Sequence, residues 1–235
     1  LGVRGLCCLV KVEDRNILID PGVALGYRRN GLLPHPVQVA VGEQVRRRIV
    51  ATLKGATDLV MSHFHGDHVP LPDANPYQLQ ARAVAPLCRS SRLWAKGTQG
   101  LSPHMVQRRA ALGEVLEREI PNAEGHADGV LAFSPSMPHG RPNTHLGTVM
   151  MTRIEGEGVV FVHASDIQLR GNLRIRATAF RGRSDSSKRF PVPTRVRAAM
   201  RSANSRRRIQ ANEPRLKRFI PRIAGTTPMS GTPSM

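Results

Sequence analysis

The sequence predicts an α/β fold, because short apolar stretches of strand length alternate with a longer stretch of helical pattern. Residues 3–12 and 16–19 are rich in Val, Leu and Ile and are separated by a charged turn, which favours two neighbouring strands. Residues 43–54 have a helical pattern, and residues 59–61 (Leu-Val-Met) form the next apolar stretch. The predicted order is therefore strand, strand, helix, strand.

The first predicted helix follows a loop. Residues 26–36 are rich in Gly, Pro and Arg, a composition typical of irregular segments. Within residues 43–54, Val45, Ile49 and Leu53 recur at the spacing that places them on one side of a helix. We therefore expect an amphipathic helix that ends before the third strand.

A second helix is predicted further along the chain. Residues 70–76 contain three prolines and are expected to form a loop. Ser102 and Pro103 are the residue types favoured at a helix N-cap and first position, so a helix is expected from there to Glu119. Trp94, on the approach to this helix, is expected to anchor packing.

The last part of the predicted domain returns to strands. Residues 130–133 are apolar and lead through Ser-Pro to a tight turn. Residues 148–154 and 159–162 flank the sequence E-G-E-G, which favours a β-hairpin.

Four metal-binding side chains follow the third predicted strand: His63, His65, Asp67 and His68. Side chains alternate along an extended chain, so the first three can point to one side. Gly66 permits a bend that brings His68 beside Asp67. Buried His and Asp without partners are costly, and three imidazoles with one carboxylate suit zinc or a similar divalent ion.

The pattern H-x-H-x-D-H is the signature of the metallo-β-lactamase-fold hydrolases, and the chain resembles an uncharacterised, mainly archaeal branch of that superfamily. The resemblance includes residues 17–26 (I-L-I-D-P-G-V-A-L-G), 134–140 (S-P-S-M-P-H-G) and 161–168 (F-V-H-A-S-D-I-Q), and it covers residues 1–169. It implies a four-layer αβ/βα sandwich. We expect this sandwich to be incomplete at its C-terminus, because the family takes one more late His and the last His here is His163.

The resemblance also implies a ligand set. A first metal would be held by the imidazoles of His63, His65 and His139. A second would be held by Asp67 and His68, and Asp166 would bridge the two. Asp20 and His163 would support these ligands, although Asp20 is equally explained as a turn-former beside Pro-Gly. The expected cofactor is Zn²⁺, one or two ions, with Mn²⁺ or Fe²⁺ as alternatives, and Asp67 is expected to take part in catalysis.

Four other histidines have competing explanations. His126, in a polar turn, and His145, after P-N-T, compete with His139 as ligands. His35 lies in a loop, where a surface position is commoner than a substrate contact. His104, in the first turn of the second predicted helix, is expected to face solvent.

The positive charge is concentrated in the last part of the chain. Of the net charge of +18, residues 1–169 contribute 18 Lys+Arg against 15 Asp+Glu, and residues 170–235 contribute 17 against 2. The sequence thus divides into a near-neutral metallo-β-lactamase-like domain, residues 1–169, and an Arg-rich basic tail, residues 170–235. The tail has three interpretations: a segment that binds nucleic acid nonspecifically through phosphates, a disordered extension, or an out-of-frame sequence.

Two functions follow as hypotheses. The first is a hydrolase that uses a metal-activated water at a mono- or dinuclear site to cleave an ester, thioester or phosphodiester in a small molecule or nucleic acid. The alternative is a catalytically inactive metal- or nucleic-acid-binding protein with a basic tail. The three cysteines show no C-x-x-C pattern, and no apolar stretch reaches the length of a membrane span. A cytoplasmic protein without a membrane partner is expected.

Overall fold

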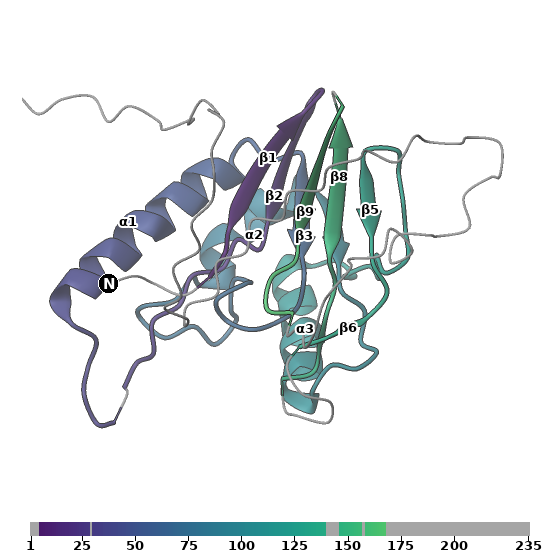
Figure 1. Ribbon diagram of the computed structural model, residues 1–235. Helices are drawn as coiled ribbons and strands as arrows, with labels where there is room; N and C mark the ends of the chain where they lie inside the picture. The colour runs from purple at the N-terminus through teal and green to yellow at the C-terminus, as the bar shows by residue number, and fades with distance from the viewer. Residues whose placement is uncertain (1–4, 29, 140–145, 157, 168–235) are drawn as a thin grey trace, which may run out of the picture. The chain divides into compact units, whose positions relative to one another are not determined.

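The computed structural model describes residues 5–28, 30–139, 146–156 and 158–167, which form a mixed α/β structure (Figure 1). It has the predicted strand-strand-helix-strand start. The helices are α1 (Pro36–Leu53), α2 (Ala81–Arg89) and α3 (Pro103–Leu116). The strands are β1 (Cys8–Val12), β2 (Arg15–Ile19), β3 (Asp58–Met61), β4 (Arg92–Ala95), β5 (Leu131–Phe133), β6 (Met137–Pro138), β7 (Thr148–Val149), β8 (Thr152–Gly156) and β9 (Val159–His163).

The first sheet has the order β1-β2-β3-β4. β1 and β2 form an antiparallel hairpin, whereas β2, β3 and β4 run parallel and are joined through α1 and α2. The carboxyl ends of parallel strands meet at one edge of a sheet. Asp20, Ser62 and Lys96, which follow these three strands, are therefore neighbours, and the backbone N–H of Lys96 still bonds to the Met61 carbonyl at 3.0 Å.

The side chains of the first sheet alternate between two apolar cores. One face packs against all three helices through a cluster that includes Leu59 and Met61. The opposite face packs against the second sheet through Ile19, Val60 and Phe133. Burial on both faces explains why residues 59–61 are continuously apolar instead of alternating with polar residues.

The second sheet is antiparallel, in the order β5-β8-β9, and β6 and β7 form a separate two-stranded ladder. Met150, which follows β7, donates its backbone N–H to the Ser62 carbonyl at 2.9 Å, so this ladder leads back to the edge of the first sheet. The described elements form three layers, namely helices, first sheet and second sheet. In the part of the chain that the structure describes, no helix follows α3.

Helix α1 begins earlier than predicted. The expected start was Glu43, but the helix starts at Pro36, inside the predicted loop. The Nδ1 atom of His35 accepts a hydrogen bond from the backbone N–H two residues later at 3.2 Å and caps the helix. His is not a usual N-cap residue, which is why the sequence pattern did not reveal this start. The predicted apolar side is confirmed, with Ile49 and Leu53 buried.

Two elements, α2 and β4, were not predicted. α2 contains Pro86, which usually marks the end of a helix, yet burial of the surrounding apolar residues holds this helix together. β4 has only four residues, and its apolar run Leu93-Trp94-Ala95 was interpreted only as the approach to the second predicted helix. Trp94 is the packing anchor that was expected: its ring stacks on Phe133 with centroids 5.4 Å apart, and its Nε1–H donates to Asp58 at 2.9 Å.

Three boundaries differ from the prediction by a few residues. The first strand, predicted from residue 3, begins at Cys8. Helix α3 has the predicted cap at Ser102, but it ends before Glu117, whose φ of 52° is left-handed, instead of at Glu119. The strand predicted over residues 148–154 is divided into β7 and β8, and β8 with β9 forms the predicted hairpin.

Several predictions concern residues outside the described ranges. The boundary between residues 169 and 170, the basic tail of residues 170–235, and His145 all lie there. Within the ranges that the structure does describe, none of the helices is both long enough and apolar enough to span a bilayer.

Candidate metal centre

Three histidines and an aspartate lie in the loop that follows β3. The backbone N–H groups of His68 and Val69 both bond to the His65 carbonyl, at 3.0 and 3.2 Å, which folds the predicted bend after His65. His63 is fully buried, and the Asp67 side chain is 26% exposed. The loop is therefore buried at His63, partly exposed at residues 65–67 and buried again at His68.

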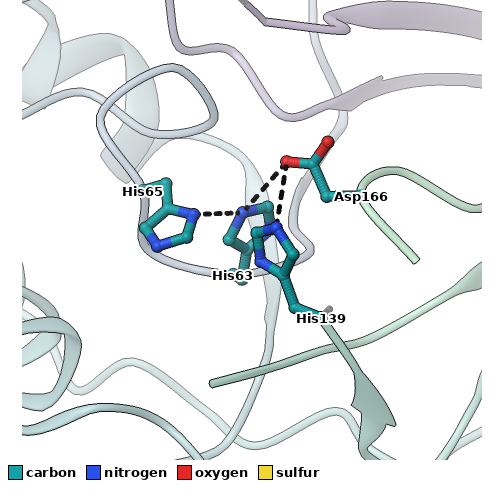
Figure 2. A group of neighbouring side chains, drawn as sticks. All are labelled: His63, His65, His139 and Asp166. Atoms are coloured by element: carbon teal, nitrogen blue, oxygen red, sulfur yellow. Dashed lines mark hydrogen bonds and ion pairs between the residues drawn. The ribbon is translucent and has the colours of Figure 1, made fainter. Parts of the chain in front are cut away.

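Two further side chains reach this loop from the second half of the described chain. His139 follows β6, and its backbone N–H bonds to the Gly147 carbonyl at 3.1 Å. Asp166 follows β9 and has a left-handed backbone, with φ of 58°. Figure 2 shows the side chains of His63, His65, His139 and Asp166 converging on one point.

The ligand atoms of these four residues all lie within 4.8 Å of one another. His63 Nε2 is 3.1 Å from His65 Nδ1. One carboxylate oxygen, Asp166 Oδ2, lies 3.6 Å from His63 Nε2 and 4.0 Å from His139 Nε2. The structure thus brings together the three histidines expected to hold the first metal and the aspartate expected to bridge.

The same oxygen also contacts the residues expected to hold a second metal. Asp166 Oδ2 is 2.9 Å from His68 Nε2, which in turn is 3.7 Å from Asp67 Oδ2. Asp166 therefore lies between the His63-His65-His139 group and the Asp67-His68 pair, which is the position a bridging carboxylate needs.

Asp20 orients the imidazoles of His68 and, through Ser62, of His63. Its buried carboxylate accepts hydrogen bonds from the backbone N–H of Ser62 at 2.7 Å, from Ser62 Oγ at 2.6 Å and from His68 Nδ1 at 2.9 Å. An ionised carboxylate only accepts, so His68 carries a proton on Nδ1. Ser62 gives its one hydrogen to Asp20, so its oxygen accepts from His63 Nδ1 at 2.9 Å. Both imidazoles therefore present Nε2 to the cluster.

A second set of close ligand atoms, from Asp20, His63 and His68, also lies within 4.8 Å. The Asp20 carboxylate is already engaged by three donors and is fully buried. Its contacts are those of an orienting group, as the resemblance implies.

The protonation of the cluster depends on burial and on neighbouring charge. Burial lowers the pKa of His63 well below its usual range, lowers that of His65 to about 4, and lowers that of His139, so all three imidazoles are neutral near pH 7. Burial also acts to lower the pKa of His68, but the carboxylates of Asp20 and Asp166 outweigh it and raise the value to about 10. The site thus combines three neutral donors with a place that favours positive charge.

His163 lies next to Asp20, on the buried side of the cluster. Its Nε2 is 3.2 Å from the Leu6 carbonyl and 3.9 Å from Asp20 Oδ2, while its Nδ1 is buried without a hydrogen-bond partner among the described residues. It touches Asp20 and none of the expected ligands in the contacts above, which agrees with a supporting position.

The donor set fits a divalent metal. His63 Nε2 and His65 Nδ1 lie 3.1 Å apart, a hydrogen bond when His65 carries its proton on Nδ1, whereas His139 Nδ1 is buried with no partner in the described part of the chain. A buried nitrogen without a partner is costly, and a neutral imidazole can give its lone pair to a metal ion. Imidazole nitrogens with one or two carboxylates are the ligands that Zn²⁺ takes in catalytic sites.

The remaining histidines lie outside the cluster. His35 caps α1 and is exposed, and His126 is exposed in the turn before β5. His104 is also exposed, as predicted, and lies 3.3 Å from Arg108 on the next turn of α3.

Two residues of the site were missed by the sequence analysis. Ser62 links Asp20 to His63, and a Ser before a histidine motif carries no signal of that role. Gly22 packs so closely that an added Cβ would lie 2.4 Å from the backbone of His68 and Val69. The sequence Asp-Pro-Gly signalled only a turn, although Gly also occurs where two backbones approach closely.

Comparison with known proteins finds relatives named UPF0282 protein. The chain is 49% identical over 168 residues to the one from Methanosarcina mazei, a match that covers 72% of this chain and 55% of that protein. It is 35% identical over 178 residues to the one from Thermococcus gammatolerans, covering 72% and 59%, and 33% identical over 178 residues to the one from Methanopyrus kandleri, covering 72% and 60%.

The chain thus spans less than two thirds of the length of these relatives. Their shared name gives no activity. No family model and no solved structure matches the chain.

Proposed function

We propose that this protein is a metal-dependent hydrolase of the metallo-β-lactamase type. The observation that carries the proposal is convergence: His63 and His65, His139, and Asp166 come from three separate parts of the sequence and place their ligand atoms within 4.8 Å. A solvated surface cluster has no reason to gather one buried and two half-buried imidazoles in this way. The two packed sheets with helices on one face would be part of the proposed four-layer sandwich.

In this proposal His63, His65 and His139 hold one Zn²⁺, Asp67 and His68 hold a second, and Asp166 bridges. A divalent ion in such a site lowers the pKa of bound water toward neutrality and polarises the scissile group. Asp20 and Ser62 keep Nε2 of His68 and His63 free by holding their Nδ1 atoms. No Ser or Cys nucleophile is required.

The proposed site has a buried end and an open end. His63 is fully buried, whereas the side chain of Asp166 is 40% exposed and that of Asp67 is 26% exposed. Substrate would therefore approach from the side of the two aspartates, where Asp67 can take part in the reaction. An ester, thioester or phosphodiester, in a small molecule or nucleic acid, fits this chemistry. The free thiols of Cys7, Cys8 and Cys88 fit the proposed cytoplasmic setting.

Metal content tests the proposal directly. We expect one or two zinc ions per purified chain by mass spectrometry, and almost none in His63→Ala/His65→Ala. The matched control is His104→Ala/His126→Ala, which removes two exposed histidines and should keep its zinc. Equal metal content in the wild-type protein and the first double variant would rule out the site. Turnover of a generic phosphodiester and a generic thioester, with Zn²⁺, Mn²⁺ or Fe²⁺ added, then separates a hydrolase from an inactive metal-binding protein.

The charge distribution favours nucleic-acid binding as a second candidate function. Residues 170–235, with 17 Lys+Arg and 2 Asp+Glu, have the composition of a nonspecific nucleic-acid-binding segment. A nucleic-acid-binding protein whose metal site is inactive would bind zinc in the same experiment but turn over neither substrate.

A further inference from the structure

A buried lysine lies at the same sheet edge as the candidate metal centre. Lys96 follows β4 and is fully buried. Its Nζ atom donates to the carbonyls of Gln99 at 2.6 Å and Gly97 at 3.2 Å, and it pairs with Glu124 Oε1 at 3.0 Å. Three acceptors satisfy the three hydrogens of an ammonium group, so the charge is fully compensated. None of these atoms belongs to the proposed ligands.

The partners of Lys96 lead to the segment that carries His139. The Glu124 side chain is only 9% exposed and accepts a hydrogen bond from Ser136 Oγ at 2.6 Å. The Gln99 carbonyl accepts from Thr148 Oγ1 at 3.0 Å and lies 3.2 Å from Ser136 Oγ, whose one hydrogen goes to Glu124. Ser136 directly precedes β6, and Thr148 lies in β7, which pairs with β6.

The same lysine is tied to the strand that carries the other ligands. Its backbone N–H bonds to the Met61 carbonyl, two residues before His63. The network of Lys96, Glu124, Ser136 and Gln99 therefore joins the β3 side of the site to the β6 side. His139 needs such a support, because it lies after a two-residue strand whose ladder is short.

We infer that Lys96 and Glu124 are positioning residues for the metal centre: their buried ion pair sets where His139 stands relative to His63 and His65, and so sets the affinity for the metal. This inference rests on the proposed function, since it assumes that these histidines bind a metal.

A second buried ion pair offers a matched control. Arg15 and Asp58, at the starts of β2 and β3, form it at the opposite end of the same sheet, with Arg15 Nε donating to Asp58 at 2.9 Å. Arg15 also pairs with Asp128 at 2.8 Å. Both pairs are buried, so removing either should destabilise the fold. Only the Lys96 pair contacts the segment of His139.

The experiment compares the two pairs in the full-length chain. Lys96→Met and Glu124→Gln are tested against Arg15→Met and Asp58→Asn. Zinc affinity is measured by competition with a chromophoric chelator. The buffer contains no denaturant, and only variants that are folded in it are compared. We expect the first two variants to bind zinc about 10–100-fold more weakly, the usual cost of losing a group that supports a ligand, and the control pair to keep wild-type affinity.

A second readout does not depend on metal. Hydrogen exchange of metal-free protein should speed up in peptides covering residues 134–139 in Lys96→Met and Glu124→Gln but not in the control pair. Where a variant at Lys96 or Glu124 does not fold, Ser136→Ala replaces it, because this change removes only the hydroxyl that joins Glu124 to the His139 segment.

The outcomes are distinct. Wild-type affinity together with unchanged exchange in the folded Lys96 and Glu124 variants, or an equal loss of affinity in the control pair, overturns the inference. A wild-type protein that binds no zinc defeats the proposed function instead, and hydrogen exchange then decides alone whether the pair positions residues 134–139.

Discussion

Asp20 and Asp166, two aspartates of the candidate site, have left-handed backbones, with φ of 49° and 58°. Such conformations are uncommon outside glycine, and Asp is among the residues that tolerate them best. Asp20 lies directly after β2, and Asp166 follows β9 after Ala164 and Ser165, so at both places the chain turns to aim a carboxylate at the histidines. Local strain of this kind is often found at functional sites, and here it coincides with the candidate metal centre.

The Asp20 carboxylate should control metal affinity without being a ligand. Asp20→Asn keeps the size of the side chain but weakens the bond that holds His68 Nδ1. We expect zinc affinity to fall about 10–100-fold while the protein stays folded. Chelator competition measures this effect. Asp14→Asn, in the exposed turn after β1, makes the same change of charge and should bind zinc as the wild type does. An unchanged affinity in Asp20→Asn would contradict the orienting role.

Gly22 should tolerate no side chain. An added Cβ would lie 2.4 Å from the backbone of both His68 and Val69, and a backbone cannot move aside as a flexible side chain can. We expect Gly22→Ala to lower the free energy of unfolding by about 1–3 kcal/mol, as overpacking does, and to weaken zinc binding. Gly26→Ala is the control, because an added Cβ there meets nothing within 4 Å. Denaturant unfolding measures the stability of both variants. If Gly22→Ala were as stable as Gly26→Ala, the loop would accommodate the added Cβ and the prediction would be wrong.

At the residue scale the motif predicts part of the site. His63, His65 and His68 were identified because several metal-binding residue types occur at close spacing. Ser62, which contacts His63, and Lys96, which lies at the same sheet edge, were not identified, because a hydroxyl or an ammonium group acquires its role only from what the fold places beside it. Such contacts join residues far apart in the sequence, and no local pattern records them.

At the scale of elements, prediction succeeded where pattern and burial agree. β3 is buried on both faces, and its sequence is an apolar run, as expected for such a strand. α3 begins at Ser-Pro and has the expected cap. It failed at two helices for different reasons. α2 forms around Pro86, because its buried apolar residues make contacts that only the assembled core supplies. α1 starts at a local cap by His35, a residue type that is not usual at this position.

The ion pair at the starts of β2 and β3 should make stability depend on pH. Burial alone would raise the pKa of Asp58, but hydrogen bonds from Arg15 and Trp94 hold it below its ordinary value of 3.8. A depressed folded pKa contributes stability that is present above about pH 3.8 and is lost as the pH falls through the folded pKa.

Asp58→Asn removes this contribution. We expect it to cost about 3–5 kcal/mol near pH 7, as when one partner of a buried pair is lost, and the difference from wild type should shrink below pH 3.8. Urea unfolding from pH 3 to pH 7 measures the difference. Asp14→Asn should track the wild type throughout. A difference that stays constant below pH 3.8 would contradict the assignment.

At the scale of the whole molecule, the candidate site draws on both sheets. His63, His65 and His68 come from the edge of the first sheet, and His139 and Asp166 follow β6 and β9. Metal binding is therefore expected to stabilise the packing of these parts, by RT ln(1 + [metal]/Kd) for a ligand that binds only the folded state. The sequence could name both groups of candidate ligands, but only the fold shows that one oxygen of Asp166 lies between them.

The charge of the whole chain leads to the last prediction. Residues 170–235 carry a net charge of +15, whereas residues 1–169 carry +3, from the counts of 17 against 2 and 18 against 15. If this excess binds phosphates, affinity for a random single-stranded RNA should fall steeply and log-linearly as salt rises, because each neutralised phosphate releases counterions. Fluorescence anisotropy at increasing salt measures the slope. His63→Ala/His65→Ala should bind RNA with the same affinity and slope, since those residues lie in the candidate metal centre. Binding that ignores salt would exclude the charge mechanism, and binding lost in the double variant would place RNA at the metal centre instead.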